Sequence, residues 1–236
     1  EMADMYARLC DASNLPLFAD GDTGYGNVTN VARTVRAYER AGVAGLFIED
    51  QVFPKRCGHM SDKAVVPLEE MLGKLKAALD ARIDADLVIM ARTDALAVNG
   101  IDDAIERAQA CAEAGADFLF VEAPVNVEQM RRICREVPGP KLANNIEGGA
   151  SPVLGAAELQ AIGYAVVVFP VAATYAIART VRELMVSIKR DGHAGGFRDR
   201  MVDFETFNAL VGLGPLRARE GRAQDFAKEL LAKRGK

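Results

Sequence analysis

The stretch Gly45-Leu46-Phe47-Ile48-Glu49-Asp50 joins a short apolar run directly to two carboxylates. An apolar run of this length after a glycine predicts a buried strand over Gly45–Ile48. The chain has five more runs of this kind, and nearly all are followed by polar or charged residues. They predict strands at Leu15–Ala19, Leu87–Ala91, Phe118–Val121, Lys141–Ala143 and Ala165–Phe169.

Amphipathic stretches between these runs predict helices. Such alternation is typical of parallel strands with helical crossovers, in a doubly wound α/β sheet or a (β/α)8 TIM barrel. A barrel gathers the carboxyl ends of its strands at one mouth, where the polar residues after each run would meet. No Gly-x-Gly-x-x-Gly turn follows any run, which disfavours a dinucleotide-binding sheet. We therefore predict a barrel, with helices at Thr29–Ala41, Leu68–Ala81, Asp102–Ala114, Val127–Glu136 and Ala156–Ile162.

Six strands are visible where a barrel has eight, so we expect the first two βα units to be missing from this chain, ahead of Glu1. After the last strand, helices are predicted at Thr174–Lys189, Asp203–Leu210 and Gln224–Lys233. We expect a barrel domain over residues 1–189 and a C-terminal helical extension over residues 190–236. These extra helices exceed what a minimal barrel uses and indicate packing on a neighbouring subunit.

The composition excludes several classes of protein. Half of the residues are hydrophobic, the net charge is −4, and no basic stripe suggests nucleic-acid binding. No apolar run approaches the roughly 20 residues that span a membrane. Four widely spaced cysteines without Cys-x-x-Cys spacing argue against disulfides or zinc and fit a cytoplasmic location. The only histidines are His59 and His193, so a metal would rest on carboxylates, which favours Mg²⁺ or Mn²⁺.

Two motifs at strand ends carry candidate chemistry. In Ala19-Asp20-Gly21-Asp22-Thr23-Gly24, two carboxylates two residues apart can face one ion, although a plain acidic turn is an alternative. In Lys55-Arg56-Cys57-Gly58-His59, basic residues surround a cysteine in a loop. Such a loop is suited to close over a bound anion, although a solvated basic loop is possible.

Further polar groups end the next strands. Arg92 follows an apolar run, and a buried arginine needs a carboxylate, either from a substrate or from a structural ion pair with a residue such as Glu122. Asn144 follows the fifth run. If these groups share one rim with Asp20 and Glu49, they describe a pocket for a metal-bound polyacid.

These motifs together resemble the isocitrate lyase/phosphoenolpyruvate mutase superfamily, over residues 15 to about 213. The Lys55-Arg56-Cys57-Gly58-His59 loop resembles the lyase branch, and Met90-Ala91-Arg92-Thr93-Asp94 looks like 2-methylisocitrate lyase. Phe120-Val121-Glu122-Ala123-Pro124 and Asn144-Asn145-Ile146-Glu147-Gly148-Gly149 look closer to the 2,3-dimethylmalate lyase and petal death protein group. The resemblance implies a Mg²⁺-dependent carbon–carbon lyase that cleaves a 2-alkylmalate-type 2-hydroxy diacid to a 2-oxo acid such as pyruvate plus a carboxylic acid.

The resemblance also implies residue roles. Asp20 and Asp22 would hold Mg²⁺, with Glu49 and Glu122 in its outer shell. Cys57 would be the catalytic acid/base, supported by Lys55 and His59, and Arg92 would act in catalysis and in substrate binding. The substrate-binding residues would be Gly58, His59, Arg92, Asn144 and Glu122.

Two departures and three alternatives remain. The family's Ser-Gly loop and Leu-Pro-Asp motif would precede Glu1, and Ile146 stands where methylisocitrate lyase has a threonine, which weakens the case for a tricarboxylate. Carboxyphosphonoenolpyruvate phosphonomutase shares the cysteine loop, and an oxaloacetate hydrolase or decarboxylase shares the fold. A non-catalytic small-acid-binding or assembly protein is the third alternative. The family also implies a homotetramer in which the helix Thr174–Lys189 is swapped between subunits.

Overall fold

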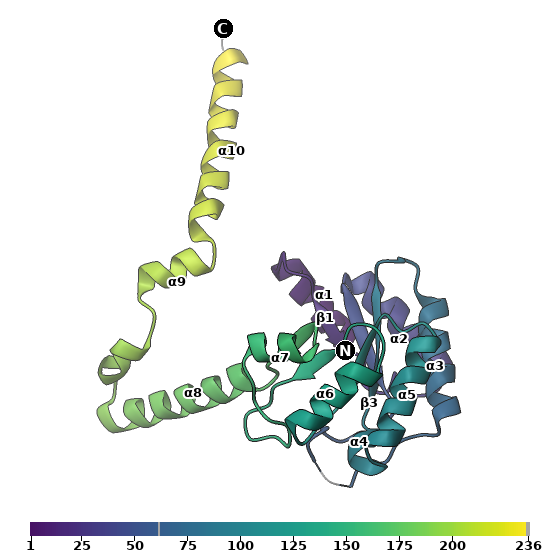
Figure 1. Cartoon of the computed structure of the whole chain (residues 1–236). Helices are drawn as coiled ribbons and strands as arrows, with labels where there is room; N and C mark the ends of the chain where they lie inside the picture. Colours follow the sequence, from purple (N-terminus) through teal and green to yellow (C-terminus); the bar gives the residue numbers. More distant parts are fainter. Residues whose placement is uncertain (61, 235–236) are drawn as a thin grey trace. The chain divides into compact units, whose positions relative to one another are not determined.

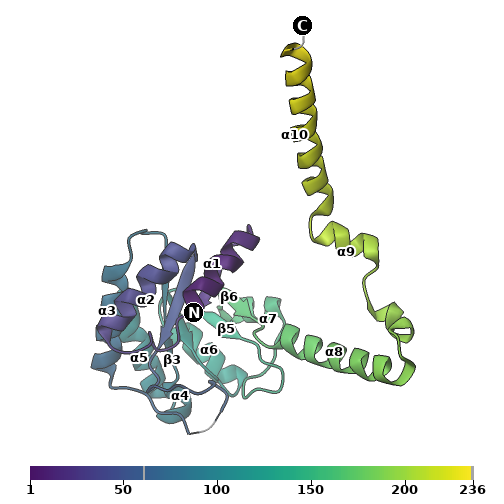
Figure 2. The same ribbon diagram turned by 180° about the vertical axis from the view of Figure 1, so that it is seen from behind.

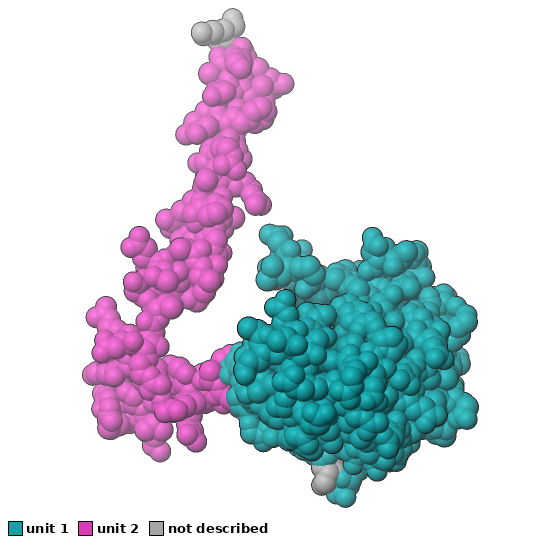
Figure 3. All heavy atoms as spheres, in the orientation of Figure 1, with its two compact units in different colours: residues 1–173 teal, residues 174–236 magenta. Residues whose placement is uncertain are grey.

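The structure, a computed structural model, describes residues 1–60 and 62–234. The chain divides into two compact units, residues 1–173 and residues 174–236, coloured teal and magenta in Figure 3. Among the described residues, the strands all lie in the first unit, and the second is helical. The polar and charged residues predicted at the strand ends therefore all lie in the first unit.

Six parallel strands follow one another in the first unit. A four-stranded sheet has the order β1-β2-β3-β4, and β5 pairs with β6. A parallel bridge between Leu119 and Lys141 joins the two sheets, so the six strands are consecutive neighbours. The strands are β1 (Phe18–Asp20), β2 (Gly45–Glu49), β3 (Val88–Thr93), β4 (Phe118–Val121), β5 (Leu142–Asn144) and β6 (Val166–Val168).

Helices cover one side of these strands, as Figures 1 and 2 show from opposite directions. Parallel strands with one helical crossover after each are the arrangement of a (β/α) barrel, so the predicted fold class is confirmed. The two further βα units stay a prediction. The helices of the first unit are α1 (Met2–Ala12), α2 (Val28–Ala41), α3 (Leu68–Ala81), α4 (Ala95–Val98), α5 (Ile101–Glu113), α6 (Val127–Glu136) and α7 (Ala156–Ile162).

The alternation of side chains along each strand separates two cores. Residues of one parity, such as Leu46 and Ile89, pack in a large cluster with the helices. Residues of the other parity form a smaller cluster, in which Met90, Phe120 and Leu142 contact Phe47. Because the period of a strand is two, the residue two positions after each member of the smaller cluster lies on its face. Those positions are Glu49, Arg92, Glu122 and Asn144.

Strand β1 and helix α4 differ from the sequence prediction. Strand β1 begins at Phe18 rather than at Leu15, because Pro16 has no N–H for a strand ladder and Leu15 is 78% exposed. Helix α4 was not predicted, since a helix of four residues is too short to show a periodic pattern in the sequence.

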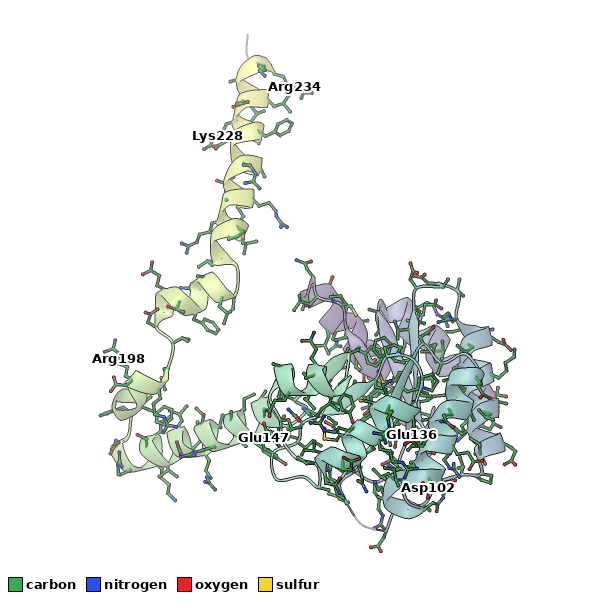
Figure 4. All side chains as sticks on the ribbon, viewed as in Figure 1. Asp102, Glu136, Glu147, Arg198, Lys228 and Arg234 are labelled. Carbon is green, nitrogen blue, oxygen red and sulfur yellow. The ribbon has the colours of Figure 1, made fainter. Side chains whose placement is uncertain are left out.

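On the surface, Arg132 of helix α6 joins two helices. It contacts Asp102 of helix α5 at 2.7 Å and Glu136 of its own helix at 3.1 Å, both labelled in Figure 4.

The second unit contains the rest of helix α8 (Ala172–Asp191), a 3-10 helix (Gly195–Arg200), α9 (Phe204–Leu210) and α10 (Leu213–Arg234). Helix α10 starts earlier than the predicted Gln224, because Pro215 is tolerated in a first turn and the single Gly221 does not stop a helix. Large apolar side chains are exposed here, including Phe204 at 85% and Leu210 at 77%. Within the described ranges, no helix combines the length and apolar character needed to cross a bilayer.

Candidate active site

Three carboxylates meet at the carboxyl ends of β1 and β2. The backbone N–H and carbonyl of Asp20 both bond the Tyr6 hydroxyl, which fixes the end of β1 against helix α1. The Asp20 carboxylate accepts the backbone N–H of Asp22 at 2.8 Å. The Asp22 carbonyl in turn accepts the backbone N–H of Glu49 at 2.8 Å. The main chain therefore positions all three residues of this carboxylate cluster, Asp20, Asp22 and Glu49.

The side chain of Lys55 places a cation among these carboxylates. Its Nζ lies 2.5 Å from Asp22 Oδ1, 3.5 Å from Asp20 Oδ2 and 3.7 Å from Glu49 Oε2. Burial by itself would lower the pKa of Lys55, but the bond to Asp22 and the charge of Glu49 raise it above its usual value. The sequence predicts Lys55 as a partner of the cysteine, whereas the structure places its ammonium in the carboxylate cluster.

Glu49 is the most buried member of this cluster. The residue is fully buried, and neither carboxylate oxygen makes a hydrogen bond within the described chain. Burial raises the pKa of Glu49 to about 7, against the attraction of Arg92 and Lys55. Carboxylate oxygens of this kind are the donors that a hard divalent ion prefers. Among the described residues no three ligating side chains surround a ready metal position, and the Lys55 ammonium lies where the three carboxylates converge.

Glu122 is the centre of a second cluster. Its Oε1 lies 2.8 Å from Nε2 of His59, and its two oxygens accept Asn144 Nδ2 at 3.2 and 3.3 Å. Nδ1 of His59 accepts the backbone N–H of Ala150 at 2.9 Å, so the imidazole links Glu122 to the loop after β5. The Asn144 Oδ1 atom is buried and has no hydrogen-bond partner in the part of the chain that the structure describes. Such an atom is available to a bound ligand.

Arg92 connects the two clusters. Its Nε lies 3.3 Å from Glu49 Oε2, and its NH2 lies 3.9 Å from Glu122 Oε2. Its guanidinium stands over the rings of Phe120 and Phe47, at 5.0 and 5.8 Å from their centroids. Burial would lower the pKa of Arg92, but the surrounding carboxylates, Glu122 first, raise it. The group is therefore a permanent cation between two sets of acids.

A loop that we call the flap, residues 53–60, lies against both clusters. The chain on either side of it is joined by the bond from Val52 N–H to the Ala64 carbonyl at 2.8 Å. Inside it, the Gln51 side chain bonds both the N–H and the carbonyl of Arg56, each at 2.9 Å. A Cβ added to Gly58 would lie 2.5 Å from Glu122 Cγ and 2.6 Å from Arg92 NH2. Only a glycine can bring the main chain this close to the site.

The structure brings the predicted site residues together. Asp20, Asp22 and Glu49 form one cluster with Lys55, and Glu122 forms the other with His59, Asn144 and Arg92. Cys57 is exposed, and its chain neighbours Lys55 and Gly58 both contact the site. Their roles in catalysis stay predictions.

A buried layer beneath the site was not predicted. Asp94 orients Arg92, with Oδ2 2.9 Å from Arg92 Nε. Asp50 accepts the Thr93 hydroxyl at 2.7 Å and lies 3.3 Å from Arg107 of helix α5. Strand alternation is the signal that could have placed Asp50 and Thr93 here, because their parity is opposite to that of Glu49 and Arg92. No comparable signal pointed to Lys63, a buried side chain that follows the flap in the sequence.

Comparison with known proteins gives one consistent family. A family model described as phosphoenolpyruvate phosphomutase matches residues 1–189. The chain is 48% identical over 219 residues to 2,3-dimethylmalate lyase of Eubacterium barkeri, covering 92% of this chain and 76% of that protein. It is 42% identical to a chloroplastic carboxyvinyl-carboxyphosphonate phosphorylmutase of Arabidopsis thaliana, covering 90% and 64%. It is 46% identical to 2-methylisocitrate lyase of Escherichia coli, covering 82% and 66%.

Solved structures agree with this family. A 2,3-dimethylmalate lyase, a member of the PEP mutase/isocitrate lyase superfamily, superposes with a TM-score of 0.87 at 36% identity, over 94% of this chain and 74% of the other. An oxaloacetate acetylhydrolase with 3,3-difluorooxalacetate gives 0.87 at 36%, over 94% and 76%. A phosphonopyruvate hydrolase in complex with oxalate and Mg²⁺ gives 0.82 at 32%, over 94% and 78%.

Proposed function

This chain belongs to the phosphoenolpyruvate phosphomutase family as a carbon–carbon lyase, and we propose that it cleaves a 2-alkylmalate into pyruvate and a second carboxylic acid. With 2,3-dimethylmalate, breaking the C2–C3 bond yields pyruvate and propionate. The C2 hydroxyl gives up its proton, and C3 receives one. The observation that carries this proposal is the position of Arg92, a buried cation between the carboxylate cluster and the Glu122 cluster.

The carboxylate cluster fits a divalent cation, Mg²⁺ or Mn²⁺. Asp20 and Asp22 would hold it, with Glu49 beside them and Glu122 further out. The fit rests on the Glu49 oxygens, which accept no hydrogen bond within the described chain, and on the cationic nitrogen that the three carboxylates already surround. When bound, such an ion lowers the pKa of a substrate hydroxyl and stabilises the negative charge of the 2-oxo acid product. The related phosphonopyruvate hydrolase carries Mg²⁺ together with oxalate, a small diacid.

The second carboxylate of the substrate belongs at the Glu122 cluster in this proposal. Arg92 supplies a permanent positive charge that attracts a carboxylate, and Asn144 provides a further polar atom beside it. The main chain of Gly58 closes this end of the site. A substrate with two carboxylates separated by two carbons would place the C2–C3 bond between the clusters.

Cys57 is the proposed proton donor. After cleavage, C3 carries a carbanion next to the second carboxylate, and the Cys57 thiol would protonate it. The thiol belongs to the flap. Near it in the sequence, Lys55 contacts the carboxylate cluster and Gly58 lies against the Glu122 cluster. A closed flap would also exclude water, which would otherwise protonate the carbanion without control.

We also propose the larger organisation that the sequence predicts. Residues 1–189 would be the barrel domain and residues 190–236 the helical extension; the family match ends at residue 189, although the compact units divide at residue 173. The exposed apolar side chains of the second unit support a homo-oligomer, a tetramer with swapped helix α8. Four free cysteines support a cytoplasmic location.

Release of pyruvate from 2,3-dimethylmalate is the deciding experiment. Purified protein with Mg²⁺ should produce pyruvate, measured with a coupled lactate dehydrogenase, and propionate in equal amounts. Addition of a chelator should stop the reaction. Oxaloacetate and carboxyphosphonoenolpyruvate are tested in parallel, because the similar proteins include an oxaloacetate acetylhydrolase and a carboxyvinyl-carboxyphosphonate phosphorylmutase. Turnover of either one without any 2-alkylmalate cleavage would contradict the substrate class.

Cys57→Ser tests the proton donor separately. The variant should bind Mg²⁺ with unchanged affinity by calorimetry and lose most of its turnover. Asp20→Ala is the matched variant in the carboxylate cluster and should lose both. Equal loss of metal binding in both variants would contradict the role of Cys57.

A further inference from the structure

Lys63 is a buried lysine that none of the sequence motifs includes. Its side chain is 2% exposed, and its Nζ lies 2.8 Å from Asp94 Oδ1. The same Nζ donates to the backbone carbonyl of Gly58 in the flap. An ammonium in so buried a position is stable only when acceptors surround it. Both acceptors belong to groups that contact the active site.

Asp94 is one of these acceptors and also holds Arg92. Its Oδ2 accepts Arg92 Nε at 2.9 Å, and its Oδ1 accepts Arg92 NH2 at 3.3 Å. The backbone N–H of Asp94 donates to Asp50 at 2.9 Å, which fixes the residue from below. Burial would raise the pKa of Asp94, but the charge of Arg92 lowers it, so the carboxylate stays ionised. Lys63 and Arg92 therefore share one fixed anion.

Gly58 is the other acceptor and forms the part of the flap that touches the site. Its main chain lies so close to Arg92 and Glu122 that a Cβ would overlap both. If the flap opened, the Gly58 carbonyl would leave Lys63, and a buried ammonium would lose one of its two acceptors. Because Asp94 stays in place, the cost of opening falls on this one bond. Hydrogen bonds to charged groups in buried places are stronger than those between neutral groups.

We propose that Lys63 is a positioning residue that holds the flap closed by bridging the Gly58 carbonyl to Asp94. It acts without touching the substrate, through the orientation of the flap that carries Cys57. The same contact couples closure of the flap to the orientation of Arg92, since Asp94 serves both cations. The consequence for catalysis rests on the proposed function, whereas the closure of the flap does not.

Site-specific proteolysis tests the closure directly. Trypsin can cleave after Lys55 and Arg56 in the flap, and cleavage requires the flap to leave the site. Lys63→Met keeps the length of the side chain but removes its charge, and cleavage after Arg56 should become about 10-fold faster. Cleavage outside the flap, followed by mass spectrometry in the same sample, should keep its rate. Lys63→Arg retains a cation, so its rate of cleavage after Arg56 should be closer to that of the native chain than the rate of Lys63→Met is.

Lys76→Met is the matched control. Lys76 forms an exposed pair with Asp80 on helix α3, with its side chain 68% exposed. This variant should leave cleavage after Arg56 unchanged. An unchanged rate in folded Lys63→Met, or an equal acceleration in Lys76→Met, overturns the proposal.

Hydrogen exchange of the unmodified protein gives a second test that needs no variant. The amide of Met60 bonds the Cys57 carbonyl, and the amide of Arg56 bonds Gln51, so a closed flap protects both. Exchange of the peptide spanning the flap should be at least about 10-fold slower than for an open chain. Exchange at the unprotected rate overturns the proposal even if Lys63→Met does not fold.

Turnover separates the two levels of the argument. If the protein is a lyase, Lys63→Met should lower kcat while calorimetry shows unchanged Mg²⁺ affinity, because Lys63 contacts neither the carboxylate cluster nor the substrate. If the native protein cleaves no 2-alkylmalate, the proposed function fails. The proteolysis and exchange results still decide the role of Lys63 in that case.

Discussion

Replacing Glu49 with glutamine should make the metal-free protein more stable at high pH. Burial raises the pKa of Glu49 to about 7, so the folded protein resists ionisation that the unfolded chain undergoes near pH 4.5. The charged form therefore costs stability as the pH rises from about 4.5 through about 7. Glutamine has the shape of the protonated acid and cannot ionise. The variant should thus escape a cost that the native chain carries above pH 7.

The size of this effect follows from the shift. A difference of about 2.5 pKa units corresponds to a loss of about 3 kcal/mol in folding stability at pH 8, where Glu49 is ionised in both the folded and the unfolded chain. At pH 5, the same ionisation of Glu49 costs only about 1 kcal/mol of folding stability. The advantage of Glu49→Gln should therefore be about 2 kcal/mol larger at pH 8 than at pH 5. In a thermal scan this is a difference of several degrees.

Urea denaturation at both pH values, with a chelator present, measures this difference. Glu113→Gln, at an exposed position at the end of helix α5, is the control for loss of one negative charge. A second arm adds Mg²⁺, which should stabilise the native chain more than Glu49→Gln if the ion binds the carboxylate cluster. An advantage of equal size at both pH values, or a loss of stability at pH 8, would refute the reasoning.

Three more predictions follow from particular contacts. Lys55→Gln removes the ammonium from the carboxylate cluster, so calorimetry should show Mg²⁺ binding about 10-fold tighter; weaker binding would mean that Lys55 does not compete with the metal. Gly58→Ala puts a Cβ into Arg92 and Glu122 and should lower turnover about 100-fold. The control is Gly73→Ala in helix α3, where a Cβ makes only an ordinary contact and should add about 0.5 kcal/mol to the stability. Equal turnover in the two variants would contradict the close fit of the flap. Arg107→Met leaves the buried Asp50 without its cation and should cost about 3–5 kcal/mol in urea denaturation, and a loss below 1 kcal/mol would show that the Thr93 bond suffices.

Strand alternation explains why so much of the site could be predicted. Glu49, Arg92, Glu122 and Asn144 each follow a short apolar strand at the parity that faces the smaller core, and parallel strands bring their carboxyl ends to one rim. The fold and the members of the site are both properties of this local pattern. They require no knowledge of how distant side chains pack.

Contacts made by long, flexible side chains could not be predicted in the same way. Lys55 reaches three carboxylates from a loop, and Lys63 reaches Asp94 across 31 residues of sequence. Both contacts depend on the conformation of the flap, which the spacing of residues does not determine. Asp50 shows the limit of strand-end reasoning itself, because it ends a strand next to Glu49 but belongs to the layer below the site.

The ammonium of Lys55 is, in effect, a counter-ion tethered to the protein. Three neighbouring acids without any positive partner would repel one another and strain the ends of β1 and β2. Because the balancing charge travels with the chain, these acids have a positive partner even when no metal is bound. If the proposed Mg²⁺ binds at this cluster, the protein should stay folded through periods of magnesium scarcity and bind the ion again afterwards.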